Sequence, residues 1–599
     1  MNSRIIDRWK LWLTGLGILL GYALVMLRLV QIQIIDHPRY ESISRDIRKR
    51  FEIIEARRGD ILDARGNLLA TTRAVIDLGV DPGAVGNEID QTKVQQLAGM
   101  IGRPVEEVLE EMGKRTIRAS DGSIRKVGWR DLAKGISEDE YDAIRALNIP
   151  GVYGNRRYLR VYPGGSLASH VIGFLNLEPV AVMGVERSMD FYLSGQRGWR
   201  ESERAGDRRE LAHLRSREVS PQAGLSVQLT IEAPVQNLVE EEIRDLVEKY
   251  SPESVSIIVS DPITGYVTAL ANYPSFDLNH YRSSSAAERR NRVLTDLYEP
   301  GSTFKVITAA AALHEKIVTP ETVFDCSFPV ATYRGRSVRL PSDHHPYGKL
   351  SVAEIVVKSS NRGAAYLGML LGEKRLHRYA GEFGFGELTG IGLPPEEVGI
   401  LHPVRNWDGL TITRMPMGHA ISATPMQVHV AISAVANRGR LMRPQIVERI
   451  LDENGQTLIR FEPYERRQVV SAEAAGLATV FMTEVASASG TAKNASLEGF
   501  SVGGKTGTTQ MLIDGVYSKK HHVASFAGFI PASNPRFAIT VVVTDPKVKG
   551  VGYGGQVAAP AFRRIAEGLV QYYQIEPDLR ADRNLLADLF ERSSRGEVN

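Results

Sequence analysis

EPGSTFKVITAAAAL, residues 299–313, places a serine and a lysine three positions apart, directly after Pro300-Gly301 and ahead of an apolar run. The alanine-rich end favours a helix, in which residues i and i+3 are neighbours, so the amine of Lys305 can reach the hydroxyl of Ser302. At a helix N-terminus the peptide dipoles also favour a developing alkoxide. The stretch therefore predicts either the start of a buried helix or a serine nucleophile with its base one turn away.

The serine-lysine spacing is weak support by itself, because a chain of this length holds such pairs by chance. A second pair, Ser123 and Lys126, lies in ASDGSIRKVGW, a turn followed by alternating residues, where a three-residue offset does not put both side chains on one face. Lys305 can act as a base only when it is neutral, so it needs burial or a neighbouring cation to lower its pKa. The rest of the sequence must supply that second cation.

The second cation is predicted at Lys505, in the glycine-rich segment FSVGGKTGTTQ, residues 500–510. The missing side chains of such a strand let a substrate backbone lie along its edge. The letters from Gly499 to Thr506 also fit the phosphate-loop pattern, but a phosphate loop needs a helix that begins at the lysine. Here Gly507 and a further turn follow without helical periodicity. We therefore interpret the segment as a strand and not as a nucleotide site.

A third motif, Ser359-Ser-Asn361, lies between the other two along the chain. By itself it would be interpreted as an N-cap for a helix that begins near Arg362. Taken together, S-x-x-K, S-x-N and K-T-G in this order form the combination found in penicillin-binding proteins and class A β-lactamases.

The chain resembles the penicillin-binding proteins over nearly its whole length. The part from Leu225 to Gln574 is similar to their transpeptidase domain, and the region before it matches as well. One anchor, an N-terminal pedestal and no glycosyltransferase-like segment resemble the monofunctional class B type. Within that class the chain is most similar to the cell-division transpeptidases of the penicillin-binding protein 3 type, with the elongation type as the alternative. The further matching segments are TPMQ (424–427), FAGFIPA (526–532), YGGQVAAP (553–560), RRGDILDARGNLLA (57–70), YPGGSLASHVIGF (162–174) and GVERSMDFYLSGQRG (184–198).

This resemblance implies a peptidoglycan D,D-transpeptidase. Ser302 would attack the carbonyl of the D-Ala-D-Ala end of a stem peptide, release D-alanine, and pass the acyl group to an amine on a neighbouring stem. Lys305 would be the base for acylation. Ser359 would relay a proton to the leaving amine, and Asn361 would orient Lys305 and the substrate amide.

The resemblance also implies where the rest of the substrate binds. Lys505, with Thr506, Gly507 and Thr508, would hold the terminal carboxylate. The backbone N–H groups of Ser302 and Thr508 would form the oxyanion hole. The same site would be acylated by β-lactams, and neither a cofactor nor a metal is implied.

Two other classes of function are carried as alternatives. A β-lactamase or carboxypeptidase needs an efficient base for deacylation, and no E-x-x-L-N segment lies between Asn361 and Lys505. A non-catalytic β-lactam sensor or scaffold would be acylated without turnover.

The N-terminus predicts a single membrane anchor. The run LWLTGLGILLGYALVML, residues 11–27, carries no charge and follows Arg4, Arg8 and Lys10. Such a helix covers about 26 Å, near the lower limit for a span, although the apolar residues after Arg28 could extend it. A cleaved signal peptide is the alternative. The positive flank predicts a cytoplasmic N-terminus and a periplasmic catalytic domain, hence a protein of the inner membrane.

Length and composition set the domain organisation. The 599 residues, with 43% hydrophobic and 24% charged residues and a net charge of +3, give no basic field for nucleic acid, and Cys326 is the only cysteine. We expect an anchor at 1–35, a mostly β, elongated pedestal at 36–224, an α/β transpeptidase domain of the serine β-lactamase-like fold at 225–574 and a charged tail at 575–599. Expected partners are stem peptides on lipid-linked or nascent glycan strands, β-lactams, the membrane, a glycosyltransferase and divisome proteins.

Local patterns predict several elements of these domains. Hairpins are expected at 58–72 and 254–274, an amphipathic helix at 233–250, and late strands at 523–531 and 537–546. Strands at both ends of a segment with helices between them predict one α/β domain whose sheet is closed late in the chain.

Two pairs of adjacent histidines are not expected to form a metal site. The adjacent histidines at 344–345 and at 521–522 would face opposite sides of a strand, so one metal ion would not take both. The sequence around His419, in TITRMPMGHAISATPMQV (residues 411–428), differs from the glycine-rich motif usual in the family. The residues that line the acceptor side are therefore not assigned from the resemblance. The methionines of this segment are expected in the core.

Overall fold

The computed structural model describes residues 3–41, 49–86, 90–118, 123–203, 217–488 and 490–579. The chain divides into two compact units, one formed by residues 1–57 with 194–224 and the other by residues 58–193 with 225–599. Each unit has its own internal packing.

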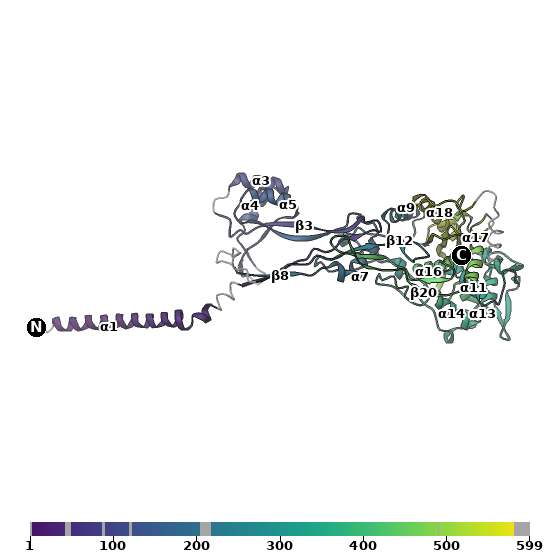
Figure 1. The fold of residues 1–599 in the computed structure, drawn as a ribbon, viewed down its shortest axis with the longest axis horizontal. Coiled ribbons are helices and arrows are strands. Elements are labelled where there is room, and N and C mark those ends of the chain that lie inside the picture. Colours follow the sequence, from purple (N-terminus) through teal and green to yellow (C-terminus); the bar gives the residue numbers. More distant parts are fainter. Residues whose placement is uncertain are drawn as a thin grey trace. The chain divides into compact units, whose positions relative to one another are not determined.

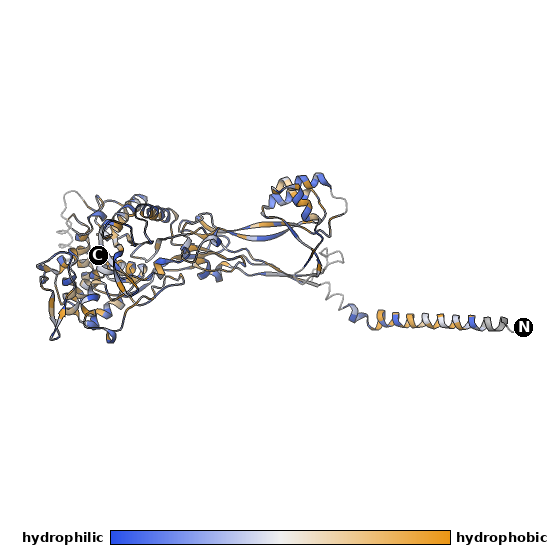
Figure 2. Ribbon diagram, turned by 180° about the vertical axis from the view of Figure 1, so that it is seen from behind, coloured by the Kyte–Doolittle hydropathy of each residue, from blue (hydrophilic) through white to orange (hydrophobic). Residues whose placement is uncertain are grey.

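The first unit begins with an apolar helix. α1 (Ser3–Val30) continues into the π-helical turn η1 (Gln31–Ile35), so the predicted continuation beyond Leu27 is confirmed. Figure 2 shows α1 in orange and white over much of its length. Trp9–Ile35 is long and apolar enough to cross a membrane, and none of its apolar window is buried; within the described ranges it is the one helix that meets this test.

The rest of the first unit is a small antiparallel sheet. β1 (Lys49–Ile54) pairs with β8 (Gly198–Glu203), and β8 pairs with β9 (Arg217–Val219). Residues 204–216, between these two strands, lie outside the described residues.

The second unit contains a sheet that joins segments far apart in the sequence. Its strands run in the order β19-β18-β10-β2-β3-β6, and β7 also pairs with β3. β2 and β3 are antiparallel, so the hairpin predicted at 58–72 is confirmed. Among the described strands of this sheet, β10 pairs with β2 on one side and with β18 on the other. The bounds are β2 (Ile61–Leu62), β3 (Leu68–Val80), β6 (Arg130–Ile136), β7 (Val152–Val161), β10 (Ser226–Leu229), β18 (Val447–Leu451) and β19 (Thr457–Arg460).

Three helices form a small cluster with the far end of β3. They are α3 (Gln91–Ile101), α4 (Val105–Gly113) and α5 (Glu138–Ala146), and Figure 1 shows them together beside this strand. Their apolar side chains, with those of β3 and β6, make a separate core.

The part of the chain predicted to be an α/β domain contains a five-stranded antiparallel sheet in the order β12-β11-β23-β22-β21. β11 (Ser254–Ser260) and β12 (Val267–Tyr273) form the predicted hairpin. β21 (Gly503–Ile513), β22 (Val516–Ile530) and β23 (Phe537–Thr544) complete the sheet from the far end of the sequence. The prediction of a sheet closed late in the chain is therefore confirmed.

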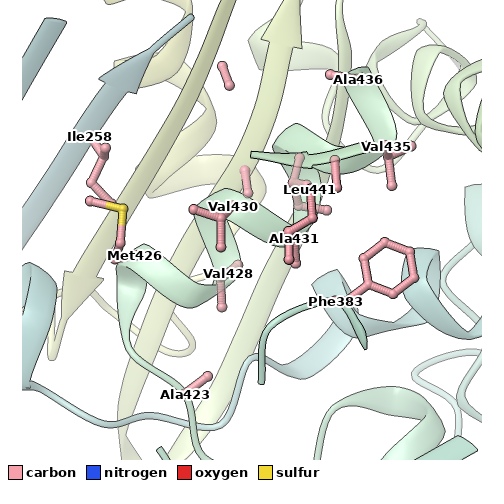
Figure 3. Packing of buried hydrophobic residues seen from close by; sticks show 14 of the residues in the cluster. Ile258, Phe383, Ala423, Met426, Val428, Val430, Ala431, Val435, Ala436 and Leu441 are labelled. Atoms are coloured by element: carbon pink, nitrogen blue, oxygen red, sulfur yellow. The ribbon is translucent and has the colours of Figure 1, made fainter. Parts of the chain in front are cut away.

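Helices bury both faces of this sheet. Because side chains alternate along a strand, Ile257 joins a core with α9 (Ala233–Tyr250) and α18 (Gly554–Tyr572), while Ile258 joins the core of the other face. α9 has the bounds predicted from its amphipathic pattern. On the second face Ile258 lies near Met426 of α16 (Pro425–Ala436), as Figure 3 shows.

The second face also contains the helix of the opening sequence. α11 (Phe304–His314) is buried from Phe304 to Leu313, and its alanines let neighbouring helices approach closely. The methionines of residues 411–428 are buried, as predicted.

Of the predicted tail at 575–599, the structure describes only the first five residues. Asp578 accepts a hydrogen bond from the backbone N–H of Ser501 at 2.8 Å, and the Leu579 N–H donates to the Gly499 carbonyl at 3.0 Å.

We predict that Phe526→Ala lowers the free energy of unfolding by about 3–5 kcal/mol, because it leaves a cavity between β22 and α18. Phe526 is 0% exposed and meets Phe562 of α18 edge to face at 4.7 Å between ring centroids. Chemical denaturation of the detergent-solubilised protein measures the change. Phe191→Ala, at a ring that is 86% exposed, is the control and should cost far less. Equal losses in the two variants would contradict the assignment of Phe526 to this core.

Candidate active site

Ser302 lies in the 3-10 turn η4 (Gly301–Thr303), which runs directly into α11. Gly301 has a left-handed φ of 58°, and a Cβ there would lie 2.4 Å from Cγ2 of Thr509. Glycine meets both demands because it has no side chain. The Ser302 side chain is half-buried, and its hydroxyl has no hydrogen-bond partner among the described residues.

Lys305 is 1% exposed, and its amine is surrounded by oxygen acceptors. Nζ donates to the Ser359 carbonyl at 2.5 Å, to Ser359 Oγ at 3.2 Å and to Asn361 Oδ1 at 2.6 Å. Three acceptors match the three donors of an ammonium; in a neutral amine the two N–H groups keep the two shorter bonds, and the lone pair can accept from the Ser359 hydroxyl at 3.2 Å. The amine is therefore bonded to residues 359–361 and not to Ser302, although the two side chains start one turn apart.

The segment at 359–361 divides its roles between two adjacent serines. Ser360 is the N-cap of α13 (Asn361–Leu371), since its hydroxyl accepts from the Gly363 N–H at 3.0 Å. Ser359 has a φ of 58°, which is rare for a residue with a side chain. The capping role is thus filled by Ser360, and the Ser359 hydroxyl is left to meet the lysines.

Lys505 comes from the edge strand β21 and is 0% exposed. Its Nζ donates to Ser359 Oγ at 3.0 Å, so one hydroxyl oxygen accepts from both Lys305 and Lys505. Lys505 lies inside a strand and not at the start of a helix, which removes the geometry that a phosphate loop requires.

Burial sets the charge state of these two amines. Burial lowers the pKa of Lys305 well below its usual value, the charge of Lys505 lowers it further, and the Asp343 carboxylate opposes the shift. Burial lowers the pKa of Lys505 to about 7. Two ammonium groups on one hydroxyl repel each other, so the site favours a neutral amine on Lys305.

Asp343 holds the 359–361 segment in place, and sequence reasoning missed it. Its Oδ2 accepts from Ser360 Oγ at 3.0 Å, and its Oδ1 accepts from the backbone N–H groups of Asn361 and of Arg362, the latter at 3.3 Å. The only signal in the sequence is a carboxylate next to the histidines at 344–345, which drew attention as metal ligands instead.

The residues after Lys505 lie along the strand edge. Thr506 Oγ1 accepts from Lys505 Nζ at 3.4 Å, and Thr508 Oγ1 accepts from the Gly554 N–H at 3.0 Å. A hydroxyl that accepts from an N–H can still donate its own proton, so the Thr508 hydroxyl remains available to a ligand oxygen. Gly507 must lack a side chain, because a Cβ would lie 2.3 Å from Ser525 Oγ.

The structure therefore brings the predicted site residues together. The one expected contact that it does not contain is a direct hydrogen bond between Ser302 and Lys305. A free serine hydroxyl, a neutral buried amine and a second amine on an open strand edge are the parts that serine acyl transfer requires.

We predict that Asp343→Asn speeds amide hydrogen exchange at Asn361 and Arg362 and costs about 1–3 kcal/mol of stability, because charge-assisted hydrogen bonds to the segment are lost. Exchange followed by mass spectrometry and thermal unfolding measure both effects. Asp408→Asn is the matched control, since Asp408 accepts from Leu410 N at 2.9 Å and Thr411 N at 2.7 Å in another loop. Unchanged exchange in Asp343→Asn would contradict the role given to this carboxylate.

Comparisons with known proteins extend over nearly the whole chain. The penicillin binding protein transpeptidase domain matches residues 255–567, and the penicillin-binding protein dimerisation domain matches residues 53–229. Stage V sporulation protein D of Bacillus subtilis (strain 168) is 32% identical over 577 residues, which are 96% of this chain and 87% of that protein. Peptidoglycan D,D-transpeptidase FtsI of Escherichia coli (strain K12) is 30% identical over 578 residues, or 95% and 93% of the two chains.

Solved structures share the fold. A peptidoglycan synthetase from Bifidobacterium adolescentis ATCC 15703 has a TM-score of 0.71 at 23% identity, over 90% of this chain and 99% of that one. Penicillin binding protein 3 from Mycobacterium tuberculosis, in complex with aztreonam, has a TM-score of 0.65 at 25% identity, over 88% and 98%. The predicted fold, a transpeptidase domain with a mostly β N-terminal region and an N-terminal apolar helix, is thereby confirmed. By the extent of these matches the chain belongs to the class B penicillin-binding proteins.

Proposed function

We propose that this protein is a serine-type peptidoglycan D,D-transpeptidase that forms its acyl-enzyme on Ser302. The observation that carries the proposal is the Ser359 hydroxyl, which accepts hydrogen bonds from two buried lysines beside a serine whose own hydroxyl is free. The name of the Escherichia coli relative, a peptidoglycan D,D-transpeptidase, supports the same reaction.

Acylation starts with the neutral amine of Lys305, which takes the proton of the Ser302 hydroxyl. The serine oxygen attacks the carbonyl carbon between the two terminal D-alanines, and the N–H groups of Ser302 and Thr508 stabilise the oxyanion. The C–N bond then breaks. The proton reaches the leaving D-alanine nitrogen through the hydroxyl of Ser359, which is bonded to the Lys305 amine at 3.2 Å.

Substrate orientation depends on the terminal carboxylate of the donor. The ammonium of Lys505, with the hydroxyls of Thr506 and Thr508, binds this group. Gly507 keeps the strand edge flat, so the donor backbone can lie along β21. An amine of a second stem then attacks the acyl-enzyme and forms the cross-link. A β-lactam follows the same first step and stays attached, because its ring opens without releasing a leaving group.

The wider setting is also a proposal. The anchor at 1–35 holds the protein in the inner membrane, with the N-terminus in the cytoplasm and the catalytic domain in the periplasm. The pedestal at 36–224 contacts a glycosyltransferase and other divisome proteins, and the transpeptidase domain extends over 225–574. The role in septal synthesis rests on the resemblance of the sequence to the cell-division type; an elongation role is the alternative.

The acyl-enzyme assignment is tested by the mass of the intact protein after treatment with penicillin. We expect one adduct on the wild type and none on Ser302→Ala, because the variant lacks the attacking oxygen. Ser123→Ala, at the other serine-lysine pair, is the matched control and should keep the adduct. An adduct on Ser302→Ala would contradict the assignment of Ser302 as the acylated residue. Cross-linking of lipid-linked glycan strands separates a transpeptidase from a sensor that is only acylated.

The charge of Lys505 predicts a pH dependence. The second-order rate constant for acylation reports on the free enzyme. The Lys505 ammonium, with a pKa of about 7, binds a substrate carboxylate below that pH and loses its charge as the pH rises through it. Acylation by a carboxylate-bearing β-lactam should therefore decline on the alkaline side of about 7. The methyl ester of the same compound lacks the carboxylate and should show no such decline. An identical alkaline decline for the ester would contradict this role of Lys505.

A further inference from the structure

The mechanism above leaves one carboxylate beside the nucleophile unused. Glu299 precedes Ser302 by three residues, and its side chain is only 16% exposed. Its Oε1 accepts from the Ala420 N–H and from the Tyr517 hydroxyl, both at 2.9 Å. Its Oε2 is buried and has no hydrogen-bond partner among the described residues. A buried carboxylate oxygen without a donor is costly, so this atom is poised to meet one that arrives with a ligand.

Close backbone contacts fix Glu299 relative to the serine. The Gly301 N–H donates to the Gly418 carbonyl at 3.1 Å. Gly418 has a φ of 82°, and a Cβ there would lie 2.1 Å from the Gly301 carbonyl oxygen. The backbone of residues 418–420 therefore lies against the turn that carries Ser302. From the other side Thr509 of β21 donates its hydroxyl to the Glu299 carbonyl at 3.2 Å.

His419 lies beside this carboxylate. Its Nε2 is 3.8 Å from Glu299 Oε2. Burial lowers the pKa of His419, and the Glu299 carboxylate opposes that shift. The imidazole is therefore neutral near pH 7 and can accept a proton. His419 lies in the segment at 411–428, where the sequence differs from the family's usual motif.

Glu299 also borders a hollow. The hollow has a volume of about 470 Å³ and is lined by Glu299 with Tyr298, Thr509 and Gln510, and also by Arg290, Arg292 and Asp296. A hollow of this volume is large enough for a piece of a peptide side chain.

We propose that Glu299, with His419, binds the primary ammonium of the acceptor and prepares it for attack. This inference rests on the proposed transpeptidase function. An acceptor stem arrives as a cation, and the Lys505 ammonium that serves the donor carboxylate repels it. Glu299 supplies the opposite charge next to the acylated serine, and its unpartnered Oε2 accepts a charge-assisted hydrogen bond from the ammonium.

The proton balance of the second half-reaction follows from this placement. The acceptor ammonium gives one proton to the imidazole of His419 and becomes a neutral amine. Its lone pair attacks the carbonyl carbon of the acyl-enzyme, and a C–N bond forms. A second proton passes from that nitrogen to Lys305 and then to the oxygen of Ser302, while the C–O bond breaks. The proton on His419 is released to solvent, and the free enzyme returns.

The test separates transfer from acylation. A thioester analogue of the acyl-D-alanine donor is supplied to the full-length protein, with D-alanine as a charged acceptor or hydroxylamine as one that is largely uncharged at neutral pH. In Glu299→Gln we expect the KM for D-alanine to rise at least about tenfold. A larger share of the acyl-enzyme should then react with water, and a smaller share with D-alanine. Penicillin acylation and transfer to hydroxylamine should stay within about twofold of the wild type.

The chain offers a matched control and a second variant. Glu315 is 20% exposed and accepts from the hydroxyl of Tyr379 at 2.6 Å, much as Glu299 accepts from Tyr517. Glu315→Gln should therefore leave the ratio of transfer to hydrolysis unchanged. Tyr517→Phe removes one hydrogen bond to Glu299 and keeps the charge, and it should raise only the KM for D-alanine. This variant carries the test if Glu299→Gln does not fold.

The possible results point in different directions. Equal losses with D-alanine and hydroxylamine would show that Glu299 shapes the serine turn and does not bind the ammonium, and the inference would fall. An unchanged ratio of transfer to hydrolysis in Glu299→Gln would overturn it as well. If the wild type is neither acylated by penicillin nor active on the thioester, the transpeptidase proposal itself fails, and this outcome is distinct from the other two.

Discussion

Two buried amines share a single hydroxyl oxygen in this protein, and the catalytic domain is arranged around that contact. Lys305 belongs to α11, Lys505 to β21, and Ser359 to the loop before α13. Each amine is costly to bury alone, because a buried charge is stable only with partners. The contact therefore requires three segments from distant parts of the sequence to meet with little freedom. It also gives the site one neutral amine and one that titrates near neutrality.

Glycine makes that convergence possible. A Cβ on Gly418 would strike the Gly301 carbonyl oxygen, and one on Gly554 would lie 2.4 Å from the Gly507 carbonyl oxygen. The backbone at Gly418 thus lies against the serine turn, and the start of α18 lies against the backbone of β21. Side chains at these positions would push apart the segments that surround the nucleophile and the strand that receives the substrate.

The electrostatics of the site suit a reaction with two differently charged partners. A donor that ends in a carboxylate needs a cation, and Lys505 lies on the strand edge along which the donor binds in our proposal. An acceptor that carries an ammonium needs an anion, and Glu299 lies three residues before the serine with an unpaired oxygen. In our proposal Lys505 attracts the donor and Glu299 attracts the acceptor. The two substrates can therefore reach the same serine in turn.

The sequence by itself determined the elements whose cause is local. The alternation at 254–274, the amphipathic pattern at 233–250 and the turn at 63–67 depend on neighbours within a few residues, and the structure has each of them. The order of the three motifs also pointed to the family. Only the tertiary structure decided that Ser360 and not Ser359 caps α13, that Asp343 holds that loop, and that Glu299 meets residues 419–420. These contacts join residues far apart in the chain, and their geometry depends on how the whole domain packs, which no local pattern encodes.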